Sequence, residues 1–530
     1  MNREPSPLLA NKNFLYATEF FSGMSIMAVE LGAGRLLAPY FSSSQIVWTI
    51  IIGTIMIALA LGNVWGGRRA DIDADPAKLY RRLIFAALWI GAIPVLGKFL
   101  ILGVAGVLIV AIDTNLLIWA ALVSCMAIFV APLFVLGTVT PSLVKYATDN
   151  LEHNGRIVGN LNAFNTVGSI IGTFLPTFVT IPAVGTAITF MIFSGILLLL
   201  GVIYFVSIGA RKVLCVMSVV IFLTCGVVGS SSGFAFWQKN LLYEGESIYN
   251  YLQVRDTPRQ IIFSTNVLFG VQSVKVKGGG LTGYYYDYAL AAPLMTGGGK
   301  ILILGMGTGT FAEQCRKYFP ASQIVGVEID EKITALARKY FDLPADVEVV
   351  TYDGRAFLQA DANVYDVILV DAFQDISPPF QMSSTEFFSL VKSHLTSRGV
   401  MVVNLNMRAS GAGNINEYLI DTIGKIFPAE KIIDARGVTN RVLFAAADEK
   451  IFDTLRSRAE ALGDAELAAL MIQTADEWST PARGSNILTD DRAPVEMLSM
   501  RALDAIIQQH LSYFKDIYRR DGLDGVLNSF

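Results

Sequence analysis

Long apolar stretches dominate the first 230 residues of the chain. A helix needs about 20 mostly apolar residues to cross a bilayer. Stretches of this kind occupy residues 14–38, 45–66, 116–140, 157–181, 184–207 and 213–230. Residues 82–112 are too long for one straight span and too short for two, which favours one span plus a re-entrant or interfacial piece. The pattern predicts about seven spanning helices, with eight as the alternative.

The periodicity changes after residue 232. Residues 246–277 alternate apolar and polar side chains, which is typical of antiparallel strands. From Lys300 onward, short apolar strands alternate with helical patterns. The strands are Ile301–Leu304, Ile324–Val327, Val347–Thr351, Val367–Val370 and Val400–Asn404, and the helices are Phe311–Tyr318 and Glu331–Tyr340. This alternation predicts a doubly wound parallel sheet.

The patterns divide the chain into four segments. Residues 1–232 form a membrane domain, residues 233–298 a β-strand subdomain with its lead-in, residues 299–448 an α/β domain, and residues 449–530 a helical extension. We therefore expect a multi-span α-helical membrane domain followed by an α/β Rossmann-like domain with a small N-terminal antiparallel β subdomain.

The charged side chains are unevenly divided along the chain. Overall, 16% of residues are charged and 53% hydrophobic, whereas an ordinary soluble domain has about 25% charged residues. Residues 1–232 hold 13 basic and 9 acidic side chains, and the remaining residues hold 28 and 36. This division indicates a lipid-embedded part and a water-exposed part, and it excludes disorder and nucleic-acid binding. The cysteines lack CxxC spacing and the histidines are scattered, so no metal site is expected.

Basic residues cluster in the predicted loops between spans. They are Arg68, Arg69, Lys78, Arg81, Arg82, Lys145, Arg156, Arg211 and Lys212. The positive-inside rule places these loops in the cytoplasm. Seven spans then put the C-terminal half outside, whereas eight keep it inside but place Lys145 and Arg156 outside.

Three charged side chains, Glu19, Glu30 and Arg35, lie within the first predicted span. Their spacing lets all three point to one side of a helix, and charges at membrane depth usually face a bundle interior or a cavity. We expect either a structural ion pair between Glu30 and Arg35 or a ligand or proton site.

Polar and small residues alternate with apolar ones in the predicted span 157–181. Asn160, Asn162 and Asn165 precede Gly168 and Gly172. Two glycines four residues apart permit close helix packing, and asparagines can form hydrogen bonds across helices. We therefore expect a packing role for this stretch.

A glycine-rich loop follows the first strand of the α/β domain. It reads Gly305-Met306-Gly307-Thr308-Gly309, and Glu328 ends the next strand. Such glycines let the backbone approach a nucleoside, and an acidic side chain at the second strand end can accept both ribose hydroxyls. Thr310 stands where a dinucleotide fingerprint has its third glycine, which favours an S-adenosyl sulfonium ligand and a class I methyltransferase-like fold.

Acidic residues also follow the next two strands. Asp353 and Gly354 come after the third strand, where a carboxylate can accept from an adenine amino group. Asp371 ends the fourth strand, and ligands bind at the carboxyl ends of parallel strands. We place Asp371 at the reacting centre. Asp375 is either a second site carboxylate or a loop cap.

With these residues identified, the region from Glu246 to Arg441 resembles spermidine synthase, the polyamine aminopropyltransferase family. The whole chain resembles bacterial membrane proteins that fuse several transmembrane helices to such a domain. The resemblance is carried by Met27–Tyr40 (MAVELGAGRLLAPY), by Asp371-Ala372-Phe373 and by Leu488–Glu496 (LTDDRAPVE).

The resemblance implies roles for the residues that match the family. Donor-binding residues would be Gly305, Gly307, Thr308, Gly309, Glu328, Asp330, Asp353 and Gly354. Asp371 would take a proton from the attacking amine. The amine substrate would contact Gln272, Tyr285, Tyr286, Asp287 and Asp375, where Tyr285 and Asp287 approximate a Tyr-x-Glu motif. The co-substrate would be decarboxylated S-adenosylmethionine or S-adenosylmethionine, with no tightly bound cofactor.

One departure from the family keeps the reaction open. Soluble aminopropyltransferases resemble GGGDGG at the glycine loop, and their Asp faces the terminal amine of the donor. Thr308 stands at that position here. The alternatives to aminopropyl transfer are another S-adenosylmethionine enzyme, which transfers a methyl or aminocarboxypropyl group or releases methylthioadenosine, and a polyamine or metabolite transporter or sensor.

The resemblance also implies a location and partners. We expect a multi-pass protein of the bacterial inner membrane, with the catalytic domain in the cytoplasm because its donor is made there. The partners would be a polyamine or amine substrate and the lipid bilayer, without nucleic acid. Soluble relatives form dimers, so the resemblance implies a homodimer.

Overall fold

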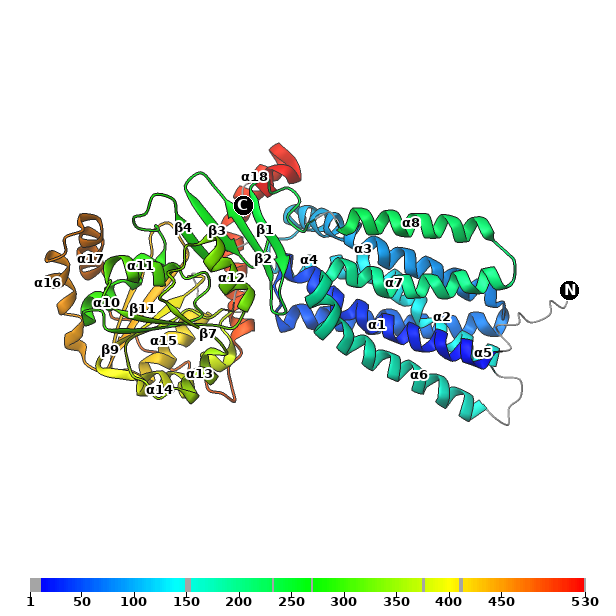
Figure 1. Cartoon of the computed structure of the whole chain (residues 1–530), viewed down its shortest axis with the longest axis horizontal. Coiled ribbons are helices and arrows are strands. Elements are labelled where there is room, and N and C mark those ends of the chain that lie inside the picture. Colours follow the sequence, from blue (N-terminus) through cyan, green and yellow to red (C-terminus); the bar gives the residue numbers. More distant parts are fainter. Residues whose placement is uncertain are drawn as a thin grey trace. The chain divides into compact units, whose positions relative to one another are not determined.

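The computed structural model describes residues 11–147, 154–230, 233–267, 270–373, 377–408 and 413–528. The chain divides into two compact units (Figure 1). The helical unit comprises residues 1–238 and 515–530, and the α/β unit comprises residues 239–514. The sequence pattern places the first boundary at residue 232. It also assigns residues 449–530 to one extension, whereas this stretch is shared between the two units.

The helical unit is built from long apolar helices. They are α1 (Lys12–Phe41), α2 (Gln45–Ile72), α3 (Pro76–Ala111), α4 (Leu116–Gly137), α5 (Val139–Ala147), α6 (Asn154–Leu175), α7 (Ile181–Ser207) and α8 (Lys212–Ser230). Six helical stretches of the described residues are long and apolar enough to cross a membrane. One of them, residues 154–207, contains both α6 and α7, which run in opposite directions in Figure 1. Its helical backbone breaks at Gly185, where φ is +81°.

The stretch around residues 82–112 is a single helix. The expected re-entrant piece is wrong, because α3 runs without interruption from Pro76 to Ala111 and includes Pro94. Asp75 caps its first turn by accepting from the Ala77 amide at 3.0 Å, and Pro76 occupies the first helical position. At 1.5 Å per residue, a helix of 36 residues is longer than the hydrocarbon core of about 30 Å. Part of α3 therefore extends beyond that core.

Helices α1 and α6 pack with their backbones in contact. A Cβ atom added to Gly168 would lie 2.0 Å from the Phe20 carbonyl oxygen, and one added to Gly172 would lie 2.1 Å from that of Met24. Only glycine permits this approach, which confirms the predicted packing role. The Asn165 amide also donates across the interface, to Glu19 at 2.8 Å.

The end of the chain returns to the helical unit. Helix α18 (Val495–Asn528) begins in the α/β unit, and its residues from 515 onward belong to the helical unit. There Lys515 pairs with Asp113. Tyr518 and Leu523 lie against Gly106 of α3.

The α/β unit starts with a small antiparallel sheet. Its strands, in spatial order, are β1 (Leu241–Glu246), β2 (Tyr251–Asp256), β3 (Gln260–Ser264) and β4 (Ser273–Val276). Alternation in residues 246–277 predicts this arrangement, and the structure confirms it. Helices α9 (Tyr285–Ala289) and α10 (Ala291–Thr296) lead from this sheet to the next.

The large sheet has seven strands in the order β10-β11-β9-β8-β5-β6-β7. Their bounds are β5 (Lys300–Leu304), β6 (Gln323–Glu328), β7 (Glu348–Thr351), β8 (Tyr365–Val370), β9 (Leu395–Leu405), β10 (Ala429–Asp434) and β11 (Arg441–Ala446). The sheet is Rossmann-like but mixed, because β11 pairs antiparallel with both β9 and β10. The predicted parallel pairing is confirmed for β5 to β9, and β10 and β11 add an antiparallel edge that the sequence pattern did not predict. Residues 429–446 form a hairpin, so the chain reverses there instead of crossing over through a helix.

Helices surround this sheet, and its core is apolar. The helices are α11 (Thr310–Tyr318), α12 (Glu331–Tyr340), α13 (Gly354–Ala360), α14 (Thr385–Ser393), α15 (Ile415–Ile426), α16 (Thr454–Glu460) and α17 (Ala465–Glu477). The central strands read as nearly continuous apolar runs because both faces of the sheet are covered. Val367, Val402 and Phe444 are each fully buried. This rigid centre fixes the strand ends, where the polar side chains lie.

Candidate active site

A cavity of about 600 Å³ opens at the carboxyl ends of the parallel strands of the α/β unit. Residues that follow β5, β6, β7, β8 and β9 line it, together with residues of the small sheet and the start of α9. Among the described residues that line the cavity, the charged side chains are Glu328, Asp353 and Asp371, and none is basic. The cavity therefore favours cationic ligands.

The glycine loop after β5 forms one wall of this cavity. Gly305 has φ +81°, and a Cβ atom there would lie 2.6 Å from the Cα atom of Ala372. A side chain at this position would push apart the loops after β5 and β8. Gly307 has φ +56°, and its amide donates to Glu328 Oε2 at 2.8 Å. The loop thus presents backbone to the cavity, as its sequence predicts.

Glu328 stands at the end of β6 with both carboxylate oxygens engaged. Oε2 accepts from the Gly307 amide, and Oε1 accepts from the Asp330 amide at 3.0 Å. Burial raises the pKa of Glu328 to about 7 in the unliganded protein, against the lowering effect of these hydrogen bonds. Asp330 itself does not line the cavity. Its carboxylate caps α12 by accepting from the Lys332 amide, and it accepts a hydrogen bond from Ser247.

Asp353 and Gly354 lie at the start of α13, on the cavity wall. The Asp353 carboxylate accepts from the Ala356 amide at 2.8 Å, so it is the N-cap of α13. Tyr352, the residue before it, also lines the cavity and is 54% exposed. The cap fixes the Asp353 carboxylate and leaves its free lone pairs available to a ligand.

Asp371 follows β8 and lines the cavity next to the glycine loop. Oδ1 accepts from the Asn404 side-chain amide at 2.8 Å, and Oδ2 accepts from the Tyr285 hydroxyl. Burial raises the pKa of Asp371 to about 7, although both hydrogen bonds act in the opposite direction. Burial and the neighbouring Asp371 carboxylate raise the pKa of the Tyr285 hydroxyl well above its usual value. At neutral pH the tyrosine is therefore the donor and the aspartate the acceptor.

Two asparagines near Asp371 were not predicted. Asn404 is 4% exposed at the end of β9, and its side-chain oxygen accepts from Asn440 at 2.9 Å. This bond leaves the Asn404 NH₂ group to donate to Asp371. The rule that ligands bind at strand ends, which identifies Asp371, could also have identified Asn404, because the predicted strand Val400–Asn404 ends at that residue. Asn440 precedes β11, a strand that the sequence pattern did not reveal.

The expected amine-binding residues are not all at the cavity. Gln272, Tyr285 and Tyr286 line it, and the Tyr286 hydroxyl donates to the Gln272 carbonyl at 2.6 Å. Asp287 does not line it. Its carboxylate accepts from the amides of Thr282 and Gly283 and from the Thr282 hydroxyl, so it holds the turn before α9. Asp375 lies outside the described residues.

Thr308 and Gly309 also do not line the cavity. The Thr308 amide donates to Ser273 at 3.1 Å, and its side chain is 1% exposed. Gly309 precedes α11 with φ +86°. Both residues belong to the glycine loop but do not line the cavity, and the uncharged side chain of Thr308 presents no charge to a ligand.

The three intramembrane candidates belong to the helical unit. Glu19, Glu30 and Arg35 all lie on α1. Glu19 is fully buried, whereas Glu30 and Arg35 are partly exposed. They take no part in the cavity, which residues of the α/β unit line.

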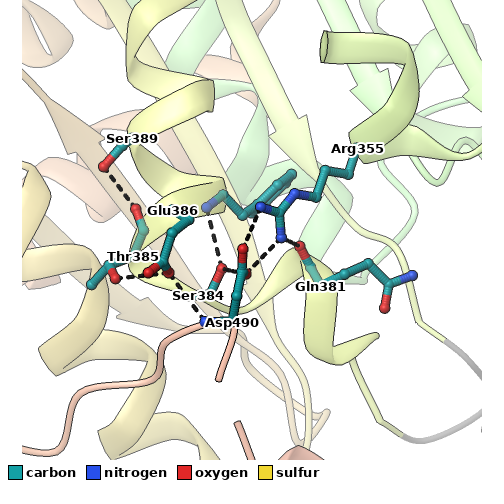
Figure 2. A network of polar contacts seen from close by, with 8 residues as sticks. Arg355, Gln381, Ser384, Thr385, Glu386, Ser389 and Asp490 are labelled. Carbon is teal, nitrogen blue, oxygen red and sulfur yellow. Dashed lines mark hydrogen bonds and ion pairs between the residues drawn. The ribbon is translucent and has the colours of Figure 1, made fainter. Parts of the chain in front are cut away.

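A polar network joins the Leu488–Glu496 motif to the cavity wall (Figure 2). Arg355 donates to both carboxylate oxygens of Asp490, at 2.7 and 2.6 Å. It also donates to the Gln381 carbonyl at 2.9 Å, and Ser384 donates to Asp490. Gln381 lines the cavity, and Arg355 follows Asp353 and Gly354 in α13. Asp490 therefore fixes two parts of the wall relative to each other.

The chain is similar to known proteins in sequence. A family model described as the spermine/spermidine synthase domain matches residues 289–427. A probable polyamine aminopropyl transferase of Bifidobacterium longum is 50% identical over 345 residues, which cover 62% of this chain and 77% of the relative. A polyamine aminopropyltransferase of Vibrio vulnificus is 27% identical over 288 residues, which cover 50% and 94%. A crystal structure of spermidine synthase in complex with the transition state analogue AdoDATO has a TM-score of 0.38 at 16% identity, covering 44% of this chain and 85% of that chain.

The Rossmann-like sheet has a cavity at the carboxyl ends of its parallel strands, which is where α/β enzymes of this class bind their ligands. The identity and coverage of the Bifidobacterium relative specify the class further. The chain belongs to the polyamine aminopropyltransferase family, and the predicted resemblance is confirmed. Within this chain the family domain is combined with six candidate membrane-spanning helical stretches among the described residues.

Proposed function

We propose that this protein transfers an aminopropyl group from decarboxylated S-adenosylmethionine to a polyamine. The observation that carries the proposal is the charge of the cavity, which has three carboxylates and no basic side chain among its described lining residues. The donor carries a sulfonium and an ammonium group and no carboxylate, and the acceptor is an ammonium compound. An acidic cavity attracts both. The carboxylate of intact S-adenosylmethionine would find no basic partner there.

The donor nucleoside is assigned to the half of the cavity near the glycine loop. Glu328 would accept from the ribose hydroxyls and Asp353 from the adenine amino group, while Gly305 and Gly307 would present their backbone to the nucleoside. A ribose that donates to Glu328 also stabilises its ionised form, so donor binding would lower the pKa of Glu328 from about 7.

Asp371 is assigned as the proton acceptor. The amine nitrogen attacks the methylene carbon bonded to the sulfonium sulfur, so that a C–N bond forms as the C–S bond breaks. The electron pair of the C–S bond goes to sulfur, and methylthioadenosine leaves as a neutral thioether. Before the attack, the acceptor ammonium group gives one proton to Asp371, which Tyr285 and Asn404 hold in place, so that the nitrogen has a lone pair. The new secondary amine then keeps its positive charge as an ammonium group. A pKa of about 7 suits this proton transfer near neutral pH.

Tyr285, Tyr286 and Gln272 are assigned to the acceptor side, because they lie on the wall that adjoins Asp371. Asp287 is assigned an indirect role, since its hydrogen bonds fix the turn from which Tyr285 projects. Asn404 is a positioning residue for Asp371.

Incubating the purified protein with each donor separately, followed by mass spectrometry, tests the reaction. Aminopropylated diamine formed from the decarboxylated donor supports the proposal, and its absence in Asp371→Asn assigns the proton acceptor. Methylthioadenosine released from intact S-adenosylmethionine without an acceptor would favour the second candidate, which Thr308 motivates because it places no carboxylate at that point of the loop. Consumption of neither donor would favour a transporter or sensor.

We propose a bacterial inner-membrane location with the α/β unit in the cytoplasm, where the donor is made. Cysteine labelling tests on which side of the membrane the α/β unit lies. Ser457 is exposed in the α/β unit, and Arg68 is exposed at the basic end of the helical unit. A Ser457→Cys variant should react with an impermeant maleimide only after the cells are permeabilised. Labelling of intact cells would overturn the cytoplasmic assignment, and Arg68→Cys reports the side of the basic loops.

We also propose that the protein is a homodimer, as the family resemblance implies. Size-exclusion chromatography with light scattering of the detergent-solubilised protein measures its mass directly. A monomer mass at all concentrations would overturn this proposal.

A further inference from the structure

Glu19 lies where three helices of the helical unit meet. Its side chain on α1 is 0% exposed. Its Oε1 atom accepts from the Thr140 hydroxyl of α5 at 2.6 Å and from the Asn165 amide of α6 at 2.8 Å. The backbone contacts between α1 and α6 at Gly168 and Gly23 hold Asn165 in this position. The surroundings of Glu19 are therefore constructed by three elements.

The second carboxylate oxygen of Glu19 has no hydrogen-bond partner among the described residues. No ion pair within the described ranges involves Glu19 either. The Ser22 hydroxyl, one helical turn further along α1, is also buried without a partner. Two buried polar atoms on one face of α1 are thus left without a hydrogen-bond partner among the described residues.

Ionisable side chains on the helices that contact α1 are engaged elsewhere. Tyr80 bonds to Thr18, Tyr146 donates to the Asp75 carbonyl, and Lys145 pairs with Asp71. Lys78 pairs with Asp73, Lys98 donates to the Gly233 carbonyl, and Arg69 and Arg82 lie over the ring of Trp65. Tyr204 stacks on Tyr80. Lys12, Arg68, Arg81 and Arg156 are exposed, and Glu30 and Arg35 lie at least three turns further along α1. None of these groups supplies a positive charge to Glu19.

An ionised Glu19 would therefore bury a negative charge with one oxygen wholly uncompensated. A buried unpaired charge costs far more than a buried neutral hydroxyl, and the cost is greatest in a membrane. The two donors on Oε1 suit the carbonyl oxygen of a carboxylic acid, which leaves Oε2 for the proton. The geometry thus matches the neutral form.

Packing alone does not require a titratable group at this position. A glutamine side-chain oxygen could accept from both Thr140 and Asn165 with the same shape. Glutamine could also place its NH₂ group at the position of Oε2. The distinguishing property of glutamate in this setting is its capacity to bind and release a proton.

We propose that Glu19 is a proton-binding site of the helical unit, formed by α1, α5 and α6, whose ligand is the proton itself. Proton occupancy at Glu19 controls the charge at the centre of this three-helix contact. The proposal is independent of the transferase reaction, because every residue in it belongs to the helical unit.

Infrared spectroscopy of the full-length protein in lipid tests the proposal through the carbonyl stretch of protonated carboxylic acids. Asp371, Glu328 and Glu430 each have a pKa raised to about 7, so the spectra are recorded at about pH 9, where these groups are ionised. The wild-type protein should show a protonated-acid band that shifts in D₂O. Glu19→Gln should lose this band, and the matched control Glu30→Gln should keep it.

Two further measurements keep the test independent of the folding of Glu19→Gln. Dicyclohexylcarbodiimide reacts with protonated acids in apolar surroundings, and it should label Glu19 and not Glu30 in the wild-type protein. Thr140→Val keeps the acid but removes one hydrogen bond to its carbonyl oxygen, so the band should shift in frequency. Absence of the band in the wild-type protein, or its persistence in Glu19→Gln, would overturn the proposal.

Discussion

Asp371 in the α/β unit and Glu19 in the helical unit each accept two side-chain hydrogen bonds, but the bonds are distributed differently over the two carboxylate oxygens. Asp371 receives one donor on each oxygen, from Tyr285 and Asn404, and lines a cavity. Glu19 receives both donors on one oxygen and is fully enclosed. Donors on both oxygens stabilise an ionised carboxylate that can accept a proton from a substrate. Donors on a single oxygen leave the other one to carry the proton.

The largest expected effect is that of Asp371→Asn. Asparagine keeps the size of the side chain but cannot accept the proton of the attacking amine, so kcat should fall by about 10²- to 10⁴-fold. Steady-state kinetics with the decarboxylated donor measures this. Methylthioadenosine binding by calorimetry is the control and should be retained. An unchanged kcat would remove Asp371 from the proton transfer and end its contrast with Glu19.

The next largest effect concerns Glu328→Gln at the other end of the cavity. Hydrogen bonds to a charged group contribute about 1.5–3 kcal/mol, so the donor KM should rise by about 10- to 100-fold. The KM of the amine should change little, because Glu328 is assigned to the nucleoside. An equal increase in both KM values would indicate general damage to the cavity.

The pH dependence follows from the raised pKa of Asp371. The base must be ionised, so kcat/KM should rise about tenfold per pH unit and level off above about 7. The folded state holds this proton more tightly than the unfolded chain does. The contribution of Asp371 to stability is therefore present at low pH and is lost as pH rises from the usual carboxyl range to about 7.

Asn404→Ala removes a hydrogen-bond donor to the Asp371 carboxylate, so it should shift the pH profile of kcat/KM to higher pH.

A smaller effect is expected at the Leu488–Glu496 motif. Asp490→Asn breaks a bidentate but partly exposed ion pair worth about 1 kcal/mol, so the donor KM should rise by about 5-fold with little change in kcat. Asp491→Asn is the matched control, since it removes the same charge one residue away. Equal effects of the two variants would mean that charge, and not the contact with Arg355, is responsible.

The smallest effect should be that of Glu19→Gln on the transferase. Glu19 and its hydrogen-bond partners belong to the helical unit, so kcat and both KM values should stay within about twofold of the wild-type values. Kinetics of the detergent-solubilised variant measures this. A large loss would show that the two carboxylates are coupled, which the comparison above does not predict.

Much of the candidate site could be predicted because strand ends are visible in the sequence. Glu328 and Asp371 directly follow an apolar run, Asp353 comes two residues after the end of β7, and all three line the cavity at that edge of the sheet. The direction of a side chain is not visible in the same way. Asp287 approximates a family position and Thr308 replaces a family aspartate, yet neither side chain lines the cavity. Asp287 accepts from the Thr282 hydroxyl in its own turn, and the Thr308 amide donates to Ser273 of β4.

Long-range pairing was the other part that the sequence could not supply. Asn440 reaches Asn404 only because β11 inserts between β9 and β10, and no local pattern specifies that order. In the helical unit, span lengths predict helices but not their continuity. Thus α3 remains a single helix through Pro94, since a proline costs only one backbone hydrogen bond and a local clash that the surrounding helices can offset.

The return of residues 515–530 to the helical unit makes the enzyme an insertion within a membrane protein rather than a domain appended to its end. The chain enters the α/β unit at residue 239 and leaves it at residue 514, so one cut in any loop of the enzyme leaves both halves tethered. Deleting the last residues would remove the pairing of Lys515 with Asp113, which lies in the helical unit and not in the enzyme. A truncation before residue 515 therefore perturbs the helical unit first, and it also cuts α18, which crosses this boundary from Val495 to Asn528.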